Sequence, residues 1–346
     1  MLPALLLLAA VADCGEPGCQ SAPAQSVSET TARITVESPV AKPPVLPPTP
    51  PPRGPATGSD FFAGLAAIYA VPPNVGACDS GRLKPEVTAR VLWIINDIRA
   101  HHDLPPVTYA AEDEGGVMAA SLMSAANAQM SHTPPPNWTC FTKAGADASA
   151  NSDLFVGIGG GLAYVSNDDI VIGWLTDIYN RTANSVGHRR WLLFPFLNSV
   201  AYGRVGAPSA ITKRIDAASI RVMNPAAGSV PAALPEVVAY PWHDYPARYF
   251  NAKALLSFSV IADKSTAFGG NSEVDFSSAQ VTIQPRGGAP LAVSSVQADN
   301  DGIGLPNNFQ FAAEGLQPNL YYDVTIAGAR VSGVAKDYHY WFRIVP

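Results

Sequence analysis

Residues 85–107 read PEVTARVLWIINDIRAHHDLPPV, and the spacing of their apolar side chains determines the fold of the region around them. An apolar residue recurs every three or four positions, which lines one face of a helix: Val87, Val91, Ile94, Ile95 and Ile98. Asn96, Asp97 and Arg99 fall away from that face. The stretch predicts an amphipathic helix over residues 85–102, which Pro105 and Pro106 end.

Two further helices are expected after this one. Residues 112–132 begin with three acidic side chains, which suit the positive end of a helix, and the prolines at 134–136 end the pattern. Residues 168–179 carry apolar side chains at helical spacing, after a glycine-rich loop at 157–161. Short β-like runs follow at 200–205, 215–223 and 237–240. Helices and strands together predict an α+β domain.

The helical period disappears after about residue 250. Short alternating or continuous apolar runs replace it, and they are separated by turn residues such as Pro285-Arg286-Gly287-Gly288. Six such runs occur, at 255–261, 280–284, 291–296, 308–311, 321–326 and 338–345. This spacing predicts a C-terminal β-sandwich of immunoglobulin or fibronectin III type.

The N-terminal region reads as an export signal followed by a spacer. Residues 1–11 form an apolar run of the length of a signal-peptide core, too short to span a bilayer. Cys14 follows Asp13 in a sequence similar to a lipoprotein cleavage box, so Cys14 is a candidate lipid anchor. The expected organisation is a signal over 1–19, a proline-rich linker over 20–59 that is disordered unless it docks, a central domain over 60–245 and a β-sandwich over 250–346.

The composition excludes two classes of partner. Charged residues make up 14% of the 346 residues, the formal net charge is −6 and the pI is near 5.5. No basic field is available to hold a nucleic acid or an acidic bilayer.

No stretch after the signal reaches the length of a membrane helix. We therefore expect an extracytoplasmic protein that is secreted, periplasmic or lipid-anchored to the cell envelope.

Four cysteines occur, at positions 14, 19, 78 and 140. None has CxxC spacing, and an oxidising compartment favours disulfides over metal binding. Three connectivities are open in principle, and we favour a bond between Cys78 and Cys140. That bond would close a loop worth about 4 kcal/mol in the chain-entropy model.

His132 and His188 are the candidate functional residues, although two distant histidines do not by themselves define a metal site. His132 stands at the expected end of the second helix, just before a run of prolines. His188 follows a glycine in the compact segment Gly187-His188-Arg189-Arg190-Trp191.

The surroundings of these histidines resemble the CAP superfamily of cysteine-rich secretory, antigen 5 and pathogenesis-related 1 proteins, in its bacterial SCP-like form. Four segments carry the resemblance over about residues 83–206: Ile95–Arg99 with Leu104–Val107, Ala125–His132, Trp174–Asp177, and Gly187–Arg189 with Val200–Gly203. In the family, the segment that begins with Gly187 and His188 opens a core strand. The order and spacing of the four segments make the match more specific than any one of them.

The resemblance implies an α-β-α sandwich with a cleft where two histidines and two acids meet, which in some members binds zinc or another divalent ion. His132 and His188 match, and Asp177 replaces the glutamate of the third helix. The second acid falls at Ala150-Asn151, where no carboxylate stands. His132 and His188 are thus tentative zinc ligands. The alternative is a polar cluster of His132, Asp177 and His188 that fastens the helices to the sheet.

The leading function is a non-catalytic binding module, because no activated nucleophile is evident. For some members the family implies small apolar ligands, such as sterols and fatty acids, or protein partners. A metal-assisted hydrolase of peptidase type that uses the His132/His188 cleft is the rival, and a structural envelope protein is a third reading. Asp299-Asn300-Asp301-Gly302 is a weak calcium candidate, and a solvated turn is favoured there.

Overall fold

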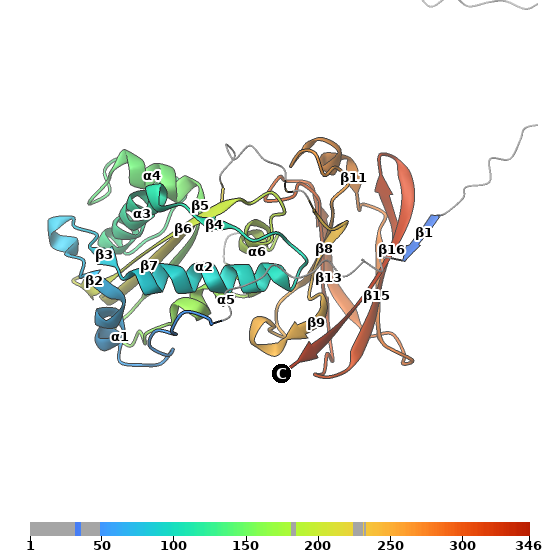
Figure 1. Cartoon of the computed structure of the whole chain (residues 1–346), viewed down its shortest axis with the longest axis horizontal. Coiled ribbons are helices and arrows are strands. Elements are labelled where there is room, and N and C mark those ends of the chain that lie inside the picture. The colour runs from blue at the N-terminus through green and yellow to red at the C-terminus, as the bar shows by residue number, and fades with distance from the viewer. Residues whose placement is uncertain (1–31, 36–48, 181–184, 224–230, 232) are drawn as a thin grey trace, which may run out of the picture. The chain divides into compact units, whose positions relative to one another are not determined.

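The computed structural model describes residues 32–35, 49–180, 185–223, 231 and 233–346. The export signal predicted over 1–19, including Cys14, lies outside these residues. Ala32–Pro346 cluster as one compact unit. This unit contains an α-β-α sandwich followed by a β-sandwich, so the predicted α+β class is confirmed (Figure 1).

A four-stranded sheet in the order β4-β6-β7-β5 forms the middle layer of the α-β-α sandwich. β6 (Ser199–Ser209) and β7 (Lys213–Arg221) form an antiparallel hairpin. β5 (Ser152–Ile158) pairs antiparallel with β7, and β4 (Thr108–Tyr109) pairs parallel with β6. Side chains of β6 point alternately to the two faces of the sheet, because strand residues have a period of two.

Helices cover both faces of this sheet (Figure 1). One face carries α3 (Glu114–Asn127) and α4 (Lys143–Ala150), and the other carries α1 (Phe61–Ile68), α2 (Pro85–Ala100) and α5 (Asn167–Thr176). Gly203 of β6 allows α3 to pack directly on the sheet, since a Cβ there would lie 2.5 Å from the backbone carbonyl carbon of Val117. The opposite face packs through side chains, for example Tyr202, whose hydroxyl donates to Asn167.

The predicted helix over 85–102 is confirmed as α2, but other predictions need correction. The helix predicted over 112–132 is wrong at its end, since α3 stops at Asn127, where Ala128 turns into the left-handed region (φ 48°). The strand implied to open at Gly187 is wrong as well. Gly187–Leu192 forms the short helix α6, and the strand begins only at Ser199.

The β-sandwich is built from two sheets. The first has the order β13-β14-β10-β8 and contains Val293–Asp299, Asn308–Ala313, Leu256–Val260 and Val237–Tyr240. The second has β16 (Val334–Val345) and β15 (Tyr321–Val331) at its centre, and β1 (Ala32–Thr35), β9 (His243–Pro246), β11 (Val274–Asp275) and β12 (Gln280–Pro285) beside them. Phe258 of the first sheet stacks on Tyr340 of the second, with 5.7 Å between ring centroids.

Two segments belong to the sandwich although they lie outside its predicted range of 250–346. β8 pairs with β10, and β9 pairs with β16, so the sandwich begins at Val237. β1, inside the predicted linker, pairs in parallel with β16. The described end of that linker also docks, because Gly58 N donates to Tyr164 O and Arg90 bonds to Pro51 O. The linker is thus attached at both described parts.

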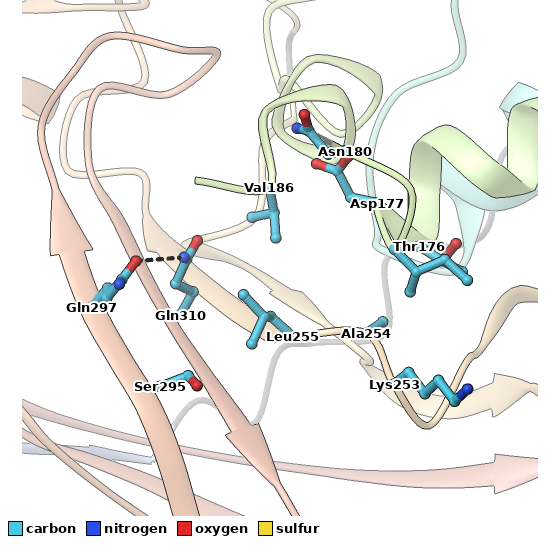
Figure 2. Close-up of a pocket in the computed structure, with 11 residues that line it drawn as sticks. Thr176, Asp177, Asn180, Val186, Lys253, Ala254, Leu255, Ser295, Gln297 and Gln310 are labelled. Atoms are coloured by element: carbon cyan, nitrogen blue, oxygen red, sulfur yellow. Dashed lines mark hydrogen bonds between the residues drawn. The ribbon is translucent and has the colours of Figure 1, made fainter. Parts of the chain in front are cut away.

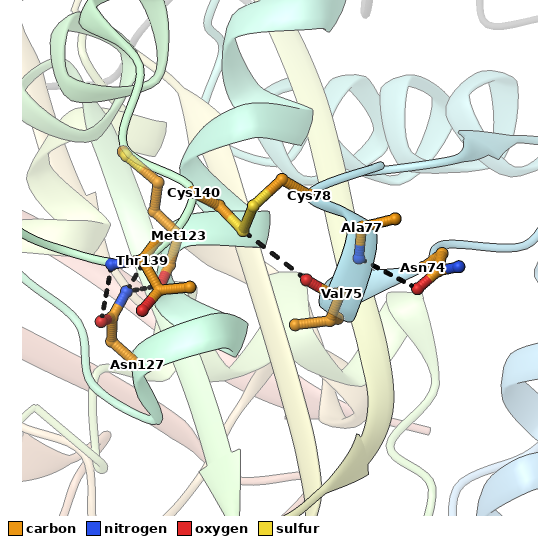
Figure 3. The surroundings of a disulfide bond; sticks show 8 residues. All are labelled: Asn74, Val75, Ala77, Cys78, Met123, Asn127, Thr139 and Cys140. Carbon is orange, nitrogen blue, oxygen red and sulfur yellow. Dashed lines mark hydrogen bonds between the residues drawn. A yellow bond between two sulfur atoms is a disulfide. The ribbon is translucent and has the colours of Figure 1, made fainter.

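The predicted disulfide between Cys78 and Cys140 is confirmed (Figure 3). It joins the turn after the 3₁₀ helix η1 (Val75–Ala77) to the loop after α3, and η1 lies between strands β2 (Tyr69–Val71) and β3 (Arg82–Leu83). Asn127 closes the loop on the α3 side, since its amide nitrogen donates to Thr139 O and its amide oxygen accepts from Thr139 N. The disulfide therefore links the turn after η1 covalently to the loop after α3.

Further 3₁₀ helices occur at η2 (Ala111–Asp113), η3 (Ala247–Tyr249) and η4 (Gly269–Glu273). Within the described part of the chain, every helix is too short or too polar to cross a bilayer.

Candidate functional site

Asp177 ends α5 and is fixed by that helix. Ser166 caps the N-terminus of α5, and the Trp174 indole nitrogen donates a hydrogen bond of 3.1 Å to Leu154 O on the sheet. Asp177 then takes a left-handed backbone conformation (φ 56°) that stops the helix. Its side chain is only 1% exposed, so the carboxylate is held inside the protein.

His188, near the start of α6, contacts this carboxylate. Its Nδ1 lies 2.7 Å from Asp177 Oδ1, and its side chain is 19% exposed. The structure thus brings together two of the three predicted site residues. The pair joins the end of one helix to the start of the next.

Asp153 is the third member of this group, and it was not predicted. It lies on β5, is 2% exposed, and interacts electrostatically with both His188 and Asp177. The resemblance placed the second acid at Ala150-Asn151, where it is missing, but β5 supplies a carboxylate a few residues later. We call Asp153, Asp177 and His188 the acid–histidine cluster.

Burial and charge act in opposite directions on the pKa of His188. Burial lowers this pKa, but the hydrogen bond that the ring donates to Asp177 and the charges of Asp153 and Asp177 outweigh burial and raise the pKa to about 9. Burial raises the pKa of Asp153 well above its ordinary value, a shift that the charge of His188 partly offsets. At neutral pH the cluster therefore holds an imidazolium against the Asp177 carboxylate.

His132 lies apart from the end of α3, in the loop that follows the helix, and its side chain is exposed. Its Nδ1 is 2.9 Å from Ser149 O at the end of α4. Among the hydrogen bonds and ion pairs of the described residues, none joins His132 to Asp177 or His188. A site that contains His132 together with the acid–histidine cluster stays a prediction.

The two arginines after His188 join α6 to the β-sandwich. Arg189, 1% exposed, donates to Leu175 O and Thr176 O of α5 and to Leu255 O and Ser257 Oγ of the sandwich. Its guanidinium also lies 3.9 Å from the centre of the Tyr240 ring. We call this arrangement the α6 clamp.

Arg190 completes the α6 clamp on its other side. Arg190 pairs with Asp299 at 2.8 Å and with Asp301 at 3.0 Å. A guanidinium between these carboxylates occupies the oxygens that the calcium candidate would need. The segment is therefore a structural contact of α6.

A pocket of about 330 Å³ opens beside Asp177 (Figure 2). Thr176, Asp177, Asn180 and Val186 line it from the α5–α6 side, and the sandwich contributes Lys253, Ala254, Leu255, Ser295, Gln297 and Gln310. Gln310 Nε2 donates to Gln297 Oε1 at 3.2 Å, which orients both amides at the pocket wall. The bonds of the α6 clamp connect the two sides of the pocket, because Arg189 bonds to both α5 and the sandwich.

Residues 92–212 match the model of the CAP, cysteine-rich secretory protein family. The chain contains a CAP domain. A search of curated proteins finds no match. The matched range covers most of α2, all of α3 to α6, and β6, the first strand of the central hairpin. The resemblance carried by the four sequence segments is therefore confirmed at the level of the family. A CAP domain indicates a binding, extracellular role in general terms.

The zinc that the resemblance implies does not fit the CAP domain of this chain. A zinc site needs three or four nitrogen, sulfur or oxygen ligands around one point. Within the part of the chain that the structure describes, no three His, Cys, Asp or Glu side chains are grouped in this way. Asp177 directs one oxygen to His188, and His132 lies against Ser149 O. We therefore assign no chemistry at this site to a metal.

Sequence reasoning missed Asp153 and the pocket for a shared reason. Asp153 lies on β5, 24 positions before Asp177 in the sequence, and approaches Asp177 and His188 only in the folded structure. The pocket forms from residues more than a hundred positions apart, such as Asp177 and Gln310. One local signal was available, because Asp153 is a lone acid within the apolar run of β5.

Proposed function

We propose that this protein is a non-catalytic, extracytoplasmic binding protein whose ligand occupies the pocket between the CAP domain and the β-sandwich. One observation carries the proposal: Asp177, a buried carboxylate already paired with His188, lines a pocket whose opposite wall belongs to a different part of the chain. A pocket of about 330 Å³ is within the range of small-molecule sites.

The state of His188 favours binding over hydrolysis. A general base must be unprotonated near the working pH, with a free nitrogen directed at the reacting group. The pKa of His188 is raised to about 9, so at neutral pH the ring is an imidazolium and its Nδ1 is engaged by Asp177. A ring in this state does not abstract a proton.

The lining of the pocket supports a polar ligand more than the small apolar ligand predicted from the family. Seven of the eleven lining residues are polar, and Lys253, Gln297 and Asp177 are among them. Leaving polar groups against a hydrocarbon chain costs free energy, because their hydrogen bonds to water are lost. A protein partner remains the alternative occupant of the same surface.

A pocket-filling variant tests this function. Gln297 is exposed on β13 and lines the pocket, whereas Ser294 is exposed on the same strand and does not. We expect Gln297→Trp to abolish the NMR shifts that small polar fragments induce in the Asn180 and Gln310 side-chain amides, and Ser294→Trp to preserve them. Wild-type protein and His188→Ala should be equally inactive toward casein and 4-nitrophenyl acetate.

Two results would count against the binding function. Hydrolysis of either substrate by the wild type that disappears in His188→Ala, with folding retained, would establish an enzyme. Fragments that shift no pocket signal in the wild type, or that shift them equally in Gln297→Trp, would remove the pocket as the binding site.

A further inference from the structure

Lys253 gives the pocket a positive group that no other described residue engages. Its side chain is exposed and belongs to the lining. Its backbone N–H donates to Asn251 Oδ1, whereas within the described residues the ammonium group has no hydrogen bond or ion pair. An ammonium group attracts anions as a compact point charge. The pocket therefore offers a cation that is available to a ligand.

Arg189 places a second positive charge directly behind the pocket wall. It is 1% exposed, and it donates to the backbone oxygens of Leu255 and Thr176, which both line the pocket. Its other hydrogen bonds go to Leu175 O and to the hydroxyl of Ser257, so within the described part of the chain no carboxylate is bonded to it. A buried charge without an ion-pair partner is poorly screened by water and salt. Arg189 therefore adds to the positive potential at the pocket.

The carboxylates near the pocket do not cancel these positive charges. Asp177 lines the pocket, but its carboxylate is paired with His188. Burial raises the pKa of Asp153 well above its ordinary value, which favours the uncharged acid. Arg190 is shared by two carboxylates of one loop. The cations outnumber the anions, and this surplus favours a negatively charged ligand. The cations are His188, Arg189, Arg190 and Lys253, and the anions are Asp177, Asp299 and Asp301.

Ser295 provides a free hydroxyl in the same lining. Its side chain is exposed, and its hydroxyl has no hydrogen-bond partner among the residues that the structure describes. Ser295 has a left-handed backbone conformation (φ 52°) inside a bulge of β13, where the pairing with β14 shifts between Ser294 and Gln297. A bulge redirects side chains, and bulges are common next to active sites. The hydroxyl can donate a hydrogen bond to a ligand or accept one from it.

Aliphatic surface separates Lys253 from Ser295. Leu255 lies between them in Figure 2, and Val186 contributes its side chain from the α5–α6 side. An inorganic anion at Lys253 would leave this surface in water. A long hydrocarbon chain would instead cover the polar groups of Ser295 and Gln297, which costs their hydrogen bonds to water. The lining thus suits a ligand with one negative charge, a short aliphatic part and a second polar group.

We propose that the pocket binds a small organic monocarboxylate, with its carboxylate paired with Lys253, its aliphatic part against Leu255 and Val186, and a second polar group at Ser295. This inference rests on the proposed function and narrows it to a ligand class. One carboxylate supplies the single charge that one ammonium group balances. A pocket of about 330 Å³ is large enough for a molecule of this kind.

The test is calorimetric titration of the full chain with N-acetylalanine, 3-hydroxybutyrate and 4-methyl-2-oxopentanoate. Each probe has one carboxylate, a short aliphatic part and a second polar group. The primary amide of each acid is its matched neutral probe, and inorganic phosphate is an anion without an aliphatic part. We expect at least one acid to bind. Its amide and phosphate should bind about tenfold more weakly or worse, the factor that one lost hydrogen bond between charged groups supplies.

Lys253→Gln tests the position of the carboxylate. The variant removes the charge and keeps a long polar side chain, so we expect the affinity for the acid to fall about tenfold with an unchanged Tm. Lys264→Gln is the matched control, because Lys264 is also an exposed lysine of the β-sandwich and does not line the pocket. It should bind the acid as the wild type does. Added salt should weaken binding to the wild type and to Lys264→Gln, because an exposed ion pair is screened.

Ser295→Ala tests the second polar contact. We expect it to weaken binding of the acid severalfold, since one hydrogen bond to the ligand is lost. Ser294→Ala is the control, because Ser294 is exposed on the same strand and does not line the pocket. Its affinity for the acid should equal that of the wild type.

Four results would overturn the monocarboxylate inference. An acid that binds the wild type, Lys253→Gln and Ser295→Ala equally binds elsewhere. An amide that binds as tightly as its acid shows that charge is not recognised, and it leaves the binding function standing. Phosphate that binds while no organic acid does shows a site for inorganic anions only. A failure of every probe removes the monocarboxylate, whereas the binding function then depends on the separate fragment test with Gln297→Trp.

Discussion

Nδ1 of His188 lies 2.7 Å from Oδ1 of Asp177, across the connection from α5 to α6. Asp177 is there because α5 ends in a left-handed turn, and His188 is there because Arg189 and Arg190 clamp α6 to the β-sandwich. The contact therefore links the CAP domain, the α6 clamp and the pocket. Asp177 is both a member of this charged pair and a lining residue of the pocket.

Removing the carboxylate should destabilise the protein. In Asp177→Ala the imidazole of His188 loses its acceptor in a largely buried position, and we expect a loss of about 2 to 3 kcal/mol in the free energy of unfolding. Urea denaturation measures this loss in the free energy of unfolding. Asp147→Ala is the control, because Asp147 forms an ion pair with Arg221 but is 62% exposed, and we expect a loss below about 1 kcal/mol. Equal losses in both variants would contradict a structural role for the buried pair.

Arg189→Met should uncouple the CAP domain from the sandwich. The substitution leaves buried carbonyl acceptors on both sides without a donor, and breaking such a buried network costs about 3 to 5 kcal/mol. We expect calorimetry to show two unfolding transitions in place of one. Arg286→Met removes an arginine that is 52% exposed and should leave one transition. A single transition of unchanged Tm in Arg189→Met would show that the α6 clamp carries no coupling.

His102 should make the fold sensitive to acid. It is 2% exposed, with Nδ1 2.8 Å from Ala239 O and Nε2 3.0 Å from Tyr245 Oη, and burial lowers its pKa to about 3. Between the unfolded pKa of 6.5 and about 3 the unfolded chain binds more protons, so stability falls as the pH falls through this window. The expected slope from this residue is up to about 1.4 kcal/mol per pH unit.

Denaturation curves between pH 7 and pH 4 measure that slope. His102→Gln should be less stable at pH 7 and should show a shallower decline toward acid, since the titrating group is gone. His132→Gln is the control, because His132 is exposed, and its slope should match that of the wild type. A wild-type slope that survives in His102→Gln would assign the acid sensitivity to other groups.

The disulfide should contribute most of its stability through the unfolded state. Cys78 and Cys140 are 62 residues apart, and a loop of this length is worth about 4 kcal/mol in the chain-entropy model. We expect the double variant Cys78→Ser/Cys140→Ser to lose about that amount in urea denaturation. The wild type treated with reductant should behave in the same way. Unchanged stability in both would mean that the bond adds nothing to the fold.

The elements that the sequence predicts well are those whose own side chains specify them. α2 follows from the spacing of Val87, Val91 and Ile94, and β8 follows from a run of four apolar residues that are all buried. Local patterns also separate the helical part of the chain from the β-sandwich. For α2 and β8, the positions of the buried side chains follow from a pattern of apolar residues within a few consecutive turns or residues of the element itself.

The corrections fall where tertiary contacts override local pattern. α3 stops at Asn127 because Ala128 adopts a left-handed conformation, and alanine carries no sequence signal for that turn. Gly187–Leu192 is a helix rather than a strand because its two arginines bond to opposite neighbours, α5 and the sandwich. The full acid–histidine cluster could not be predicted from the sequence, because Asp153 lies 24 positions before Asp177 and meets it only in the folded structure.

The most direct measurement of the central claim is an NMR titration of the His188 ring in the wild type and in Asp177→Asn. The account predicts a wild-type pKa of about 9, because Asp177 holds the imidazolium. In Asp177→Asn the pKa should fall to 6.5 or below, since burial then dominates. A wild-type His188 that titrates near 6.5, and is unaffected by Asp177→Asn, would contradict the claim that His188 and Asp177 form a charged pair beside the pocket.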